Sequence, residues 1–288
     1  FLFVGWLVLW LALGAYESQP LALLVNFVTN LGPDLVSAIG TVAGFWALGG
    51  PLRSRLVPDF AADDPATCAL LEIGLGLAAL VLITSLLGSF GLLLPVVARG
   101  IFIVGLCAAV LRIKRLAVRS QSEVRKGISL IVPLITAAVL LPCLFSIAAP
   151  PVGPDEVQYH RRFVEHILRT GGVPGDGHDP LSSFALGLHC LASIPASLTG
   201  VSALRPFGFL LGLAGILGGE RLFRRTFGPG RTWIYLGVLL SSVSLVRALP
   251  LFTTDLPLAL LVALIALLAL DWTQAVGDPG GRPWAMAL

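Results

Sequence analysis

Residues 68–90, CALLEIGLGLAALVLITSLLGSF, contain a single charged side chain, Glu72. A helix needs about 20 consecutive, mostly apolar residues to cross the hydrocarbon core of a bilayer, and this segment is long enough. Its glycines are compatible with that structure, because membrane helices tolerate glycine when neighbouring groups satisfy the backbone. The segment therefore predicts a helix that spans a membrane.

Composition extends this prediction to the whole chain. Of the 288 residues, 56% are hydrophobic and 12% are charged, and the mean hydropathy is +0.92. Soluble domains carry about a quarter charged residues, because their surfaces face water. Most of the surface of this chain must therefore contact something other than water, so we expect an all-α polytopic membrane protein.

Further apolar segments accompany residues 68–90. They cover residues 1–15, 34–52, 94–113, 127–149, 203–220, 232–250 and 256–271. The sequence therefore predicts about eight transmembrane helices. Because the chain begins at Phe1 without a methionine and stops shortly after a polar stretch, we expect a fragment of a longer protein with its first span cut short.

The basic residues predict the orientation of these spans, since Lys and Arg in short loops stay on the cytoplasmic side. They cluster in three places, which are Arg53 with Arg55, residues 112–126, and Arg221 to Arg231. Eight alternating spans place all three clusters inside. The segments left outside are residues 16–33, 91–93, 150–202 and 251–255. We expect a multi-pass protein of the inner or plasma membrane.

The outer segment 150–202 is far longer than the handful of residues that a simple connection needs. It holds all four histidines of the chain, which are His160, His166, His178 and His189. So many titratable side chains in one segment predict a functional element at the extracytoplasmic face.

Two helices are expected within this segment. Residues 154–170 predict an amphipathic helix that ends at Gly171–Gly172, because apolar side chains recur at helical spacing. Its apolar stripe consists of Tyr159, Phe163, Val164, Ile167 and Leu168. Residues 181–199 are apolar enough to span the membrane, but a span there would move the Arg221 cluster outside. We therefore predict an amphipathic surface helix, with one apolar face towards the bilayer.

Three motifs follow one another from this segment onwards. They are PDEVQYHRRFVEHILRTGG at 154–172, LRPFGFLLGLAGILGGERLFRRTFG at 204–228 and LFTTDLPLALLVALIALLAL at 251–270. The first places Asp-Glu-x-x-Tyr beyond a membrane helix, the second begins a span with Arg205, and the third opens a span with Asp255. In order and sidedness they resemble the GT-C superfamily of membrane glycosyltransferases, in the family 39-like branch of protein mannosyltransferases and lipid A aminoarabinose transferases.

The resemblance covers residues 127–272 and implies both a fold and an activity. Residues 127–288 would be the N-terminal part of a GT-C-like transmembrane core, with 150–202 as its extracytoplasmic loop. Residues 1–126 would be membrane helices of unassigned role, which precede the place where the family core begins. The implied activity is an inverting transfer of a sugar from a polyprenyl-phosphate donor to an acceptor glycan, lipid or protein. No nucleic-acid partner is expected.

The resemblance also implies roles for individual residues. Asp155 is the expected general base, with Glu156 second, because a partly desolvated carboxylate can take a hydroxyl proton. Arg205 matches the position of the family's arginine and is expected to bind the donor phosphate, since an arginine fork stabilises the charge of a leaving phosphate. Arg247 lies eight residues before Asp255, about 12 Å along a helix, so by this spacing we expect it to face the phosphate as well. The residues expected to line the site are Asp255, Tyr159, His160 and His178. The lysine that some aminoarabinose transferases carry before the surface helix is absent, and His178 and Asp179 lie nearby instead.

Simpler roles remain open for the same residues. Asp155 and Asp255 are suited to capping helices, while Arg205 and Arg247 are suited to reaching the interface from the ends of spans. The histidines, together with Asp155 or Glu156, are candidate ligands for a divalent metal ion, although no HxxxH pair is present. The four cysteines have no CxxC spacing, which argues against a disulfide framework or a zinc site.

Two other functions also fit a helical membrane protein. A transporter or lipid flippase places charged side chains within spans near the midplane, where this chain has essentially Glu72 alone. A non-enzymatic scaffold subunit would use the segment 150–202 as a docking surface. The sequence favours the glycosyltransferase because the acids and histidines gather in the outer segments.

Overall fold

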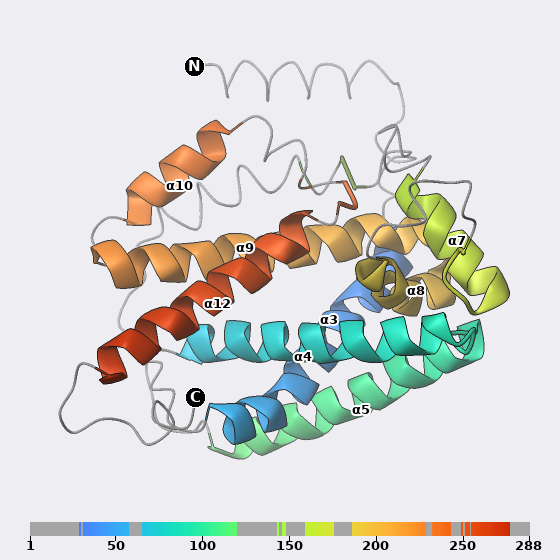
Figure 1. The fold of residues 1–288 in the computed structure, drawn as a ribbon, viewed down its shortest axis with the longest axis horizontal. Coiled ribbons are helices and arrows are strands. Elements are labelled where there is room, and N and C mark those ends of the chain that lie inside the picture. The colour runs from blue at the N-terminus through green and yellow to red at the C-terminus, as the bar shows by residue number, and fades with distance from the viewer. Residues whose placement is uncertain are drawn as a thin grey trace.

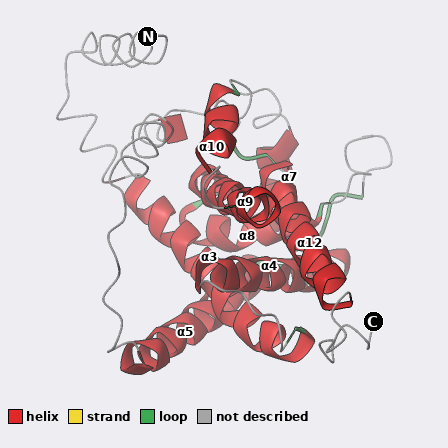
Figure 2. Cartoon of the chain, turned by 90° about the vertical axis from the view of Figure 1, so that its left-hand side faces the viewer, coloured by secondary structure: helices red, strands yellow, loops and turns green. Residues whose placement is uncertain are grey.

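The structure is a computed structural model. It describes residues 29, 31–57, 65–119, 143, 146–147, 159–175, 186–228, 232–242, 249, 251–253 and 255–276. Every regular element within these residues is a helix, and no strand occurs among them (Figure 2). The all-α prediction is therefore confirmed for the part of the chain that is described.

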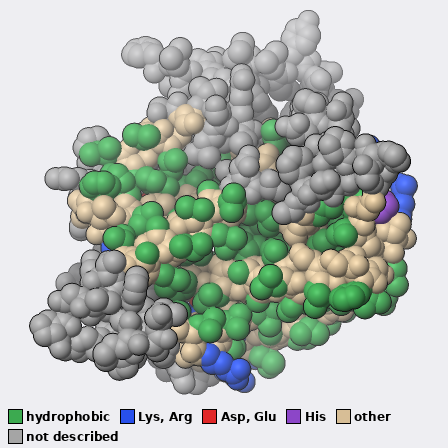
Figure 3. Space-filling view, in the orientation of Figure 1, with side chains coloured by type: hydrophobic (Ala, Val, Ile, Leu, Met, Phe, Trp, Pro, Cys, Tyr) green, Lys and Arg blue, Asp and Glu red, His purple; other side chains and the backbone are tan. Residues whose placement is uncertain are grey.

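Four of these helices are long and apolar enough to cross a membrane. They are α3 (Gly32–Leu56), α4 (Pro65–Ser89), α5 (Pro95–Arg119) and α9 (Leu204–Phe227), the last preceded by the 3₁₀ turn η4 (Val201–Ala203). They match the predicted spans 34–52, 68–90, 94–113 and 203–220. Most of the exposed side chains of α5 are apolar, and only 17% of its most apolar 18 residues are buried. Such a surface suits lipid rather than water, and Figure 3 shows apolar side chains spread over the molecule with Lys and Arg at its rims.

The remaining helices are shorter. They are α7 (Arg161–Thr170), α8 (Gly187–Thr199), α10 (Thr232–Ser241) and α12 (Asp255–Val276). Helix α10 covers the first part of the predicted span 232–250, and the apolar part of α12 is Pro257–Leu270. The predicted span 1–15 and nearly all of 127–149 lie outside the described residues. The count of eight spans therefore stays a prediction.

Glycines allow α3, α4 and α5 to pack backbone against backbone. A Cβ added at Gly76 of α4 would lie 2.6 Å from the Phe45 carbonyl carbon of α3, and one at Gly49 would lie 2.9 Å from the Glu72 Cα. Helices α3 and α5 cross where Gly44 and Gly105 meet, since a Cβ on either would lie 3.2 Å from the Cα of the other. Close approach through small residues is the usual way in which helices associate without a hydrophobic driving force.

One end of this bundle, called the loop end below, joins two of the segments predicted to lie outside. The backbone N–H of Leu93, in the α4–α5 turn, donates to the carbonyl oxygen of Gly171 at 2.8 Å. The N–H of Val173 donates to the Gly88 carbonyl oxygen at 3.1 Å. The end of α4, the start of α5, α7 and the start of α9 lie together at the right of Figure 1.

The opposite end, called the basic end below, joins two of the basic clusters predicted to lie inside. Arg53 near the end of α3 and Arg112 in the last part of α5 both bind Glu72 near the start of α4. Helix α9 also ends on this side, with Arg224 and Arg225 in its last turn (Figure 1). The grouping of helix ends therefore agrees with the predicted alternation of α3, α4, α5 and α9.

Helix α7 confirms the predicted amphipathic helix in the part that is described. Phe163, Val164 and Ile167 of the predicted stripe are buried. The helix ends at Gly171, whose φ of 74° is left-handed and whose N–H donates to the Ile167 carbonyl oxygen at 2.8 Å. The predicted start at residues 154–158 lies outside the described residues.

The predicted surface helix at 181–199 is wrong in one respect. Helix α8 has 13 residues and is about 20 Å long, which is too short to span a membrane. In Figure 1 it is seen nearly end-on, while α4 and α9 run across the view. However, every side chain from His189 to Ser197 is buried, and α8 packs against α3, α4, α5, α7 and α9. Its buried serines tolerate this covering because their hydroxyls bond within the helix, Ser193 Oγ donating to the Cys190 carbonyl oxygen at 2.6 Å and Ser197 Oγ to the Ile194 carbonyl oxygen at 2.7 Å.

Candidate functional site

A cluster of rings at the loop end brings three distant segments of the chain together. Its members, called the histidine cluster below, are Tyr159, His160, Phe163, His189 and Phe252. Two members, Tyr159 and His160, lie directly before α7, and Phe163 lies in its first turn. His189 is in α8, and Phe252 lies three residues before α12. The cluster therefore joins the predicted outer segment 150–202 to the predicted outer segment 251–255.

A hydrogen bond between the two histidines lies at the centre of this cluster. His160 Nδ1 and His189 Nε2 are 2.8 Å apart. The ring planes differ by 17° and the ring centres are 5.1 Å apart. Nearly parallel planes with so short an N···N distance mean that the rings lie side by side, edge to edge, rather than face to face. The far nitrogens, His160 Nε2 and His189 Nδ1, therefore point away from the shared bond.

Other rings enclose the pair. The ring of Tyr159 lies 4.5 Å from that of His160 and 5.2 Å from that of His189. Phe252 meets the two histidines edge to face, at 5.5 Å and 6.2 Å. The exposed fraction is 5% for His160 and 0% for His189. These contacts leave the imidazoles little freedom to rotate.

Burial has a direct electrostatic consequence. It lowers the pKa of His189 to about 3, with a smaller contribution from the neighbouring His160, because a charged imidazole would lose its hydration. Burial also raises the pKa of Tyr159. Both side chains are therefore neutral at physiological pH.

The lowered pKa of His189 predicts an acid-labile fold. Between the unfolded pKa near 6.5 and the folded value near 3, the unfolded chain binds more protons, so stability falls as pH falls through this window. We expect the wild type to lose up to about 1.4 kcal/mol per pH unit more than His189→Gln below pH 6.5. Thermal unfolding in nanodiscs at pH 7.5, 6.0 and 5.0 measures the difference, and parallel curves for the two proteins would contradict it.

Of the two predicted phosphate-binding residues, Arg205 lies among the described residues. It lies in the first turn of α9, at the loop end, and is 5% exposed. Its Nη1 donates to the Ser146 carbonyl oxygen at 3.2 Å. Ser146 belongs to the predicted span 127–149 that leads to Asp155. The guanidinium is thus buried within the protein beside that span, which differs from the simpler role of reaching towards interfacial water.

Several predicted site residues are not among those that the structure describes. Asp155, Glu156, His178 and Arg247 lie outside the described residues. Asp255 begins α12, but nothing is described of its side chain. Of the predicted residues, Tyr159 and His160 are in contact with each other, and their contacts with Phe252 and His189 bring them near the start of α12. The roles assigned to all of these residues stay predictions.

From the sequence, His189 was considered only as one of the candidate metal ligands. Its position in an apolar stretch is a signal that could have identified it, since an ionisable residue within an apolar helix is a functional candidate by default. The sequence could not supply its partner, because His160 lies on another helix 29 residues away in the chain.

A second charged cluster lies at the basic end. The Glu72 carboxylate, with 4% of its side chain exposed, accepts from Arg53 Nε at 3.0 Å and from Arg112 Nη2 at 2.6 Å. The Arg112 guanidinium lies 4.1 Å above the centre of the Trp46 ring, and its Nη1 donates to the Trp46 carbonyl oxygen. These contacts tie α3, α4 and α5 together and neutralise a carboxylate placed within a span.

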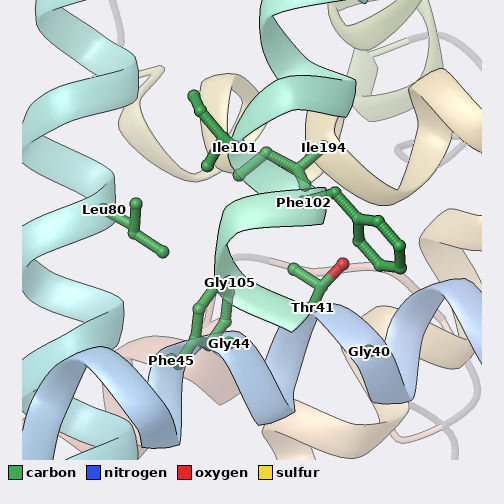
Figure 4. A pocket seen from close by; sticks show the side chains of 9 residues that line it. All are labelled: Gly40, Thr41, Gly44, Phe45, Leu80, Ile101, Phe102, Gly105 and Ile194. Atoms are coloured by element: carbon green, nitrogen blue, oxygen red, sulfur yellow. The ribbon is translucent and has the colours of Figure 1, made fainter. Parts of the chain in front are cut away.

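The described residues show no site for a metal ion. Among them, no group of three or more His, Cys, Asp or Glu side chains is arranged to hold a metal. A hollow of about 10 Å³ lies between α3, α4, α5 and α8 (Figure 4), which is at the lower limit for one water molecule. Its wall is apolar except for Thr41, so this hollow is a packing defect rather than a binding site.

Comparison with known proteins does not place the chain in a family. No protein-family model, no curated protein and no solved structure matches it. The function has to follow from the residues at the loop end and from the motifs of the sequence.

Proposed function

We propose that the chain is part of a membrane glycosyltransferase that moves a sugar from a polyprenyl-phosphate donor to an acceptor at the loop end. The observation that carries this proposal is the histidine cluster, in which the Asp-Glu-x-x-Tyr segment meets the segment that opens α12. Arg205 is buried at the same end of the bundle. In this proposal the bundle has about eight spans, and the loop end is extracytoplasmic in an inner or plasma membrane.

The proposed reaction uses a base and an anion-binding group. The acceptor hydroxyl attacks the anomeric carbon of the donor and transfers its proton to Asp155, with Glu156 as the second candidate base. The bond from the anomeric carbon to the phosphate oxygen breaks, and the polyprenyl phosphate leaves with the electron pair of that bond. The configuration at the anomeric carbon of the sugar is inverted. Arg205, with Arg247, stabilises the charge that this phosphate gains.

The geometry favours an enzyme over a transporter. Transporters place charged side chains near the midplane, where they bind cargo. Glu72 lies in the second turn of α4, near the basic end, and two arginines already hold its carboxylate. At the described loop end, two buried histidines instead lie where three segments of the chain meet. A scaffold subunit would have no need to bury two histidines there.

The substitution Asp155→Asn in the full-length protein tests the proposed function. It removes the base and leaves the size of the side chain unchanged, so we expect transfer to fall by at least about a hundredfold. Membrane insertion and stability should be unaffected. Transfer from a polyprenyl-phosphate sugar is measured in nanodiscs with a radiolabelled donor.

The matched control is Glu165→Gln, which removes a carboxylate from the partly exposed face of α7. It should transfer sugar at the wild-type rate. Unchanged transfer by Asp155→Asn would remove the role of Asp155 as base. A wild-type protein with no transfer from any polyprenyl-phosphate sugar would contradict the proposed function itself.

A further inference from the structure

Arg53, at the basic end of the bundle, uses only part of its guanidinium group within the protein. Its Nε donates to Glu72 Oε1 at 3.0 Å, and the edge formed by Nη1 and Nη2 has no partner among the described residues. The Arg53 side chain is 26% exposed, whereas that of Glu72 is 4% exposed. Arginine presents its N–H donors in a rigid fork that fits a carboxylate or a phosphate. Because Nε faces a buried carboxylate, the outer edge is the part of the guanidinium left for a ligand.

Arg112 holds the carboxylate that orients Arg53. Its Nη2 donates to Glu72 Oε2 at 2.6 Å, and its Nη1 donates to the Trp46 carbonyl oxygen. Its guanidinium carbon lies 4.1 Å above the centre of the Trp46 ring. One oxygen of Glu72 is thus fixed by α5, and the other is presented to Arg53. The conformational entropy that an unrestrained arginine loses on binding is therefore reduced before a ligand arrives.

The charge of this cluster is not balanced. Two arginines share a single carboxylate, so the cluster keeps one net positive charge. The exposed side chains of Arg55, Lys114 and Arg115 lie on the last parts of the same two helices, α3 and α5. Arg53 itself lies three residues before the end of α3, and arginines near the ends of spans extend to the headgroup layer. The ligand that fits this place is an anion of the headgroup layer.

We propose that the outer edge of the Arg53 guanidinium binds the phosphate of an anionic phospholipid in the cytoplasmic leaflet. The predicted orientation puts the basic end on the cytoplasmic side, where the membrane surface is negative and basic sites between spans bind headgroups. Two parallel N–H bonds from one arginine edge to two phosphate oxygens give the contact a direction. A headgroup binds at the surface of a bundle, so this site needs no enclosed chamber. It is independent of the proposed function, since it lies at the opposite end from the loop end.

The test measures binding of dioleoyl phosphatidylglycerol to the full-length protein in detergent micelles, by native mass spectrometry over a series of lipid concentrations. Arg53→Gln and Arg55→Gln each remove one positive charge from the last turn of α3, so general attraction to an anionic lipid should fall alike in both. Arg55 is exposed and has no hydrogen bond or ion pair with the described residues. Only Arg53→Gln also removes an oriented fork, so we expect it to bind the lipid about tenfold more weakly than Arg55→Gln.

A second pair of variants keeps the charge at both positions. Arg53→Lys replaces the fork by a point charge that can still pair with Glu72, and it should bind about threefold more weakly than Arg55→Lys. This pair decides the question if Arg53→Gln does not fold. Equal affinities within the pair that folds would overturn the directed contact at Arg53.

Two further ligands identify the source of the phosphate. Dioleoyl phosphatidylcholine, whose choline cancels the phosphate charge, and glycerol 3-phosphate, which has no acyl chains, should both bind the wild type more weakly than phosphatidylglycerol. Equal binding of phosphatidylcholine would overturn the preference for an anionic lipid, and equal binding of glycerol 3-phosphate would overturn the lipid as the ligand. None of these measurements involves sugar transfer, so a protein without transferase activity would contradict the proposed function and leave this result unchanged.

Discussion

We expect Glu72→Gln to unfold with a free energy lower by about 3 kcal/mol and a Tm lower by roughly 5–10 °C. The substitution keeps the size of the side chain and removes the charge that Arg53 and Arg112 share. Removing one partner from a buried ion cluster leaves the other charges uncompensated, and this is costlier than the net value of the cluster itself. The arginine side chains are 26% and 22% exposed, so solvent reduces the cost below that of a fully buried pair.

The chain offers a matched control for this prediction. Glu165→Gln makes the same chemical change beside Arg161, at the same Nε–Oε1 distance of 3.0 Å. That pair lies on the surface of α7, with side chains 43% and 35% exposed, and such i,i+4 pairs contribute about 0.5 kcal/mol or less. Thermal unfolding of both variants in nanodiscs measures the contrast. Equal and small shifts would show that the Glu72 cluster does not hold α3, α4 and α5 together.

The spans, and which of their ends lie on the same side, could be predicted because both depend on the composition of single segments. The length of an apolar run and the positions of Lys and Arg are properties of each segment by itself. The structure accordingly agrees with the prediction at α3, α4, α5 and α9, and at the contacts that define the loop end and the basic end. The ion pairs of Glu72 could not be predicted, because they require knowing which helices are neighbours.

Helix α8 is an element whose position composition alone does not predict. Its apolar character was read correctly, and a ninth span was rejected because it would have moved the Arg221 cluster outside. Whether a short apolar helix lies on the bilayer or inside a bundle depends on its partners, and the partners come from both halves of the chain. The burial of His189 follows from that packing. The histidines of the outer segment could therefore be recognised from the sequence, but the pair that two of them form could not.

Tight backbone contact between α3 and α4 gives the other large expected effect. We expect Gly76→Ala to destabilise the full chain by at least about 3 kcal/mol, because the new methyl group would overlap the backbone of Phe45. A side chain can rotate out of the way, but a helix backbone cannot, so the two helices must move apart. Their separation would also stretch the contacts of Arg53 with Glu72, which bridge the same pair of helices.

Gly100→Ala is the control, since a Cβ at Gly100 of α5 meets nothing within 4 Å. Alanine there should be neutral or stabilise the helix by up to about 1 kcal/mol, as expected from helix propensity alone. Both variants are compared with the wild type by thermal unfolding in nanodiscs. If Gly76→Ala unfolds at the wild-type temperature, α3 and α4 do not approach as closely as the structure shows. If it is destabilised while Gly100→Ala is not, glycine is required at this crossing for α3 and α4 to approach each other.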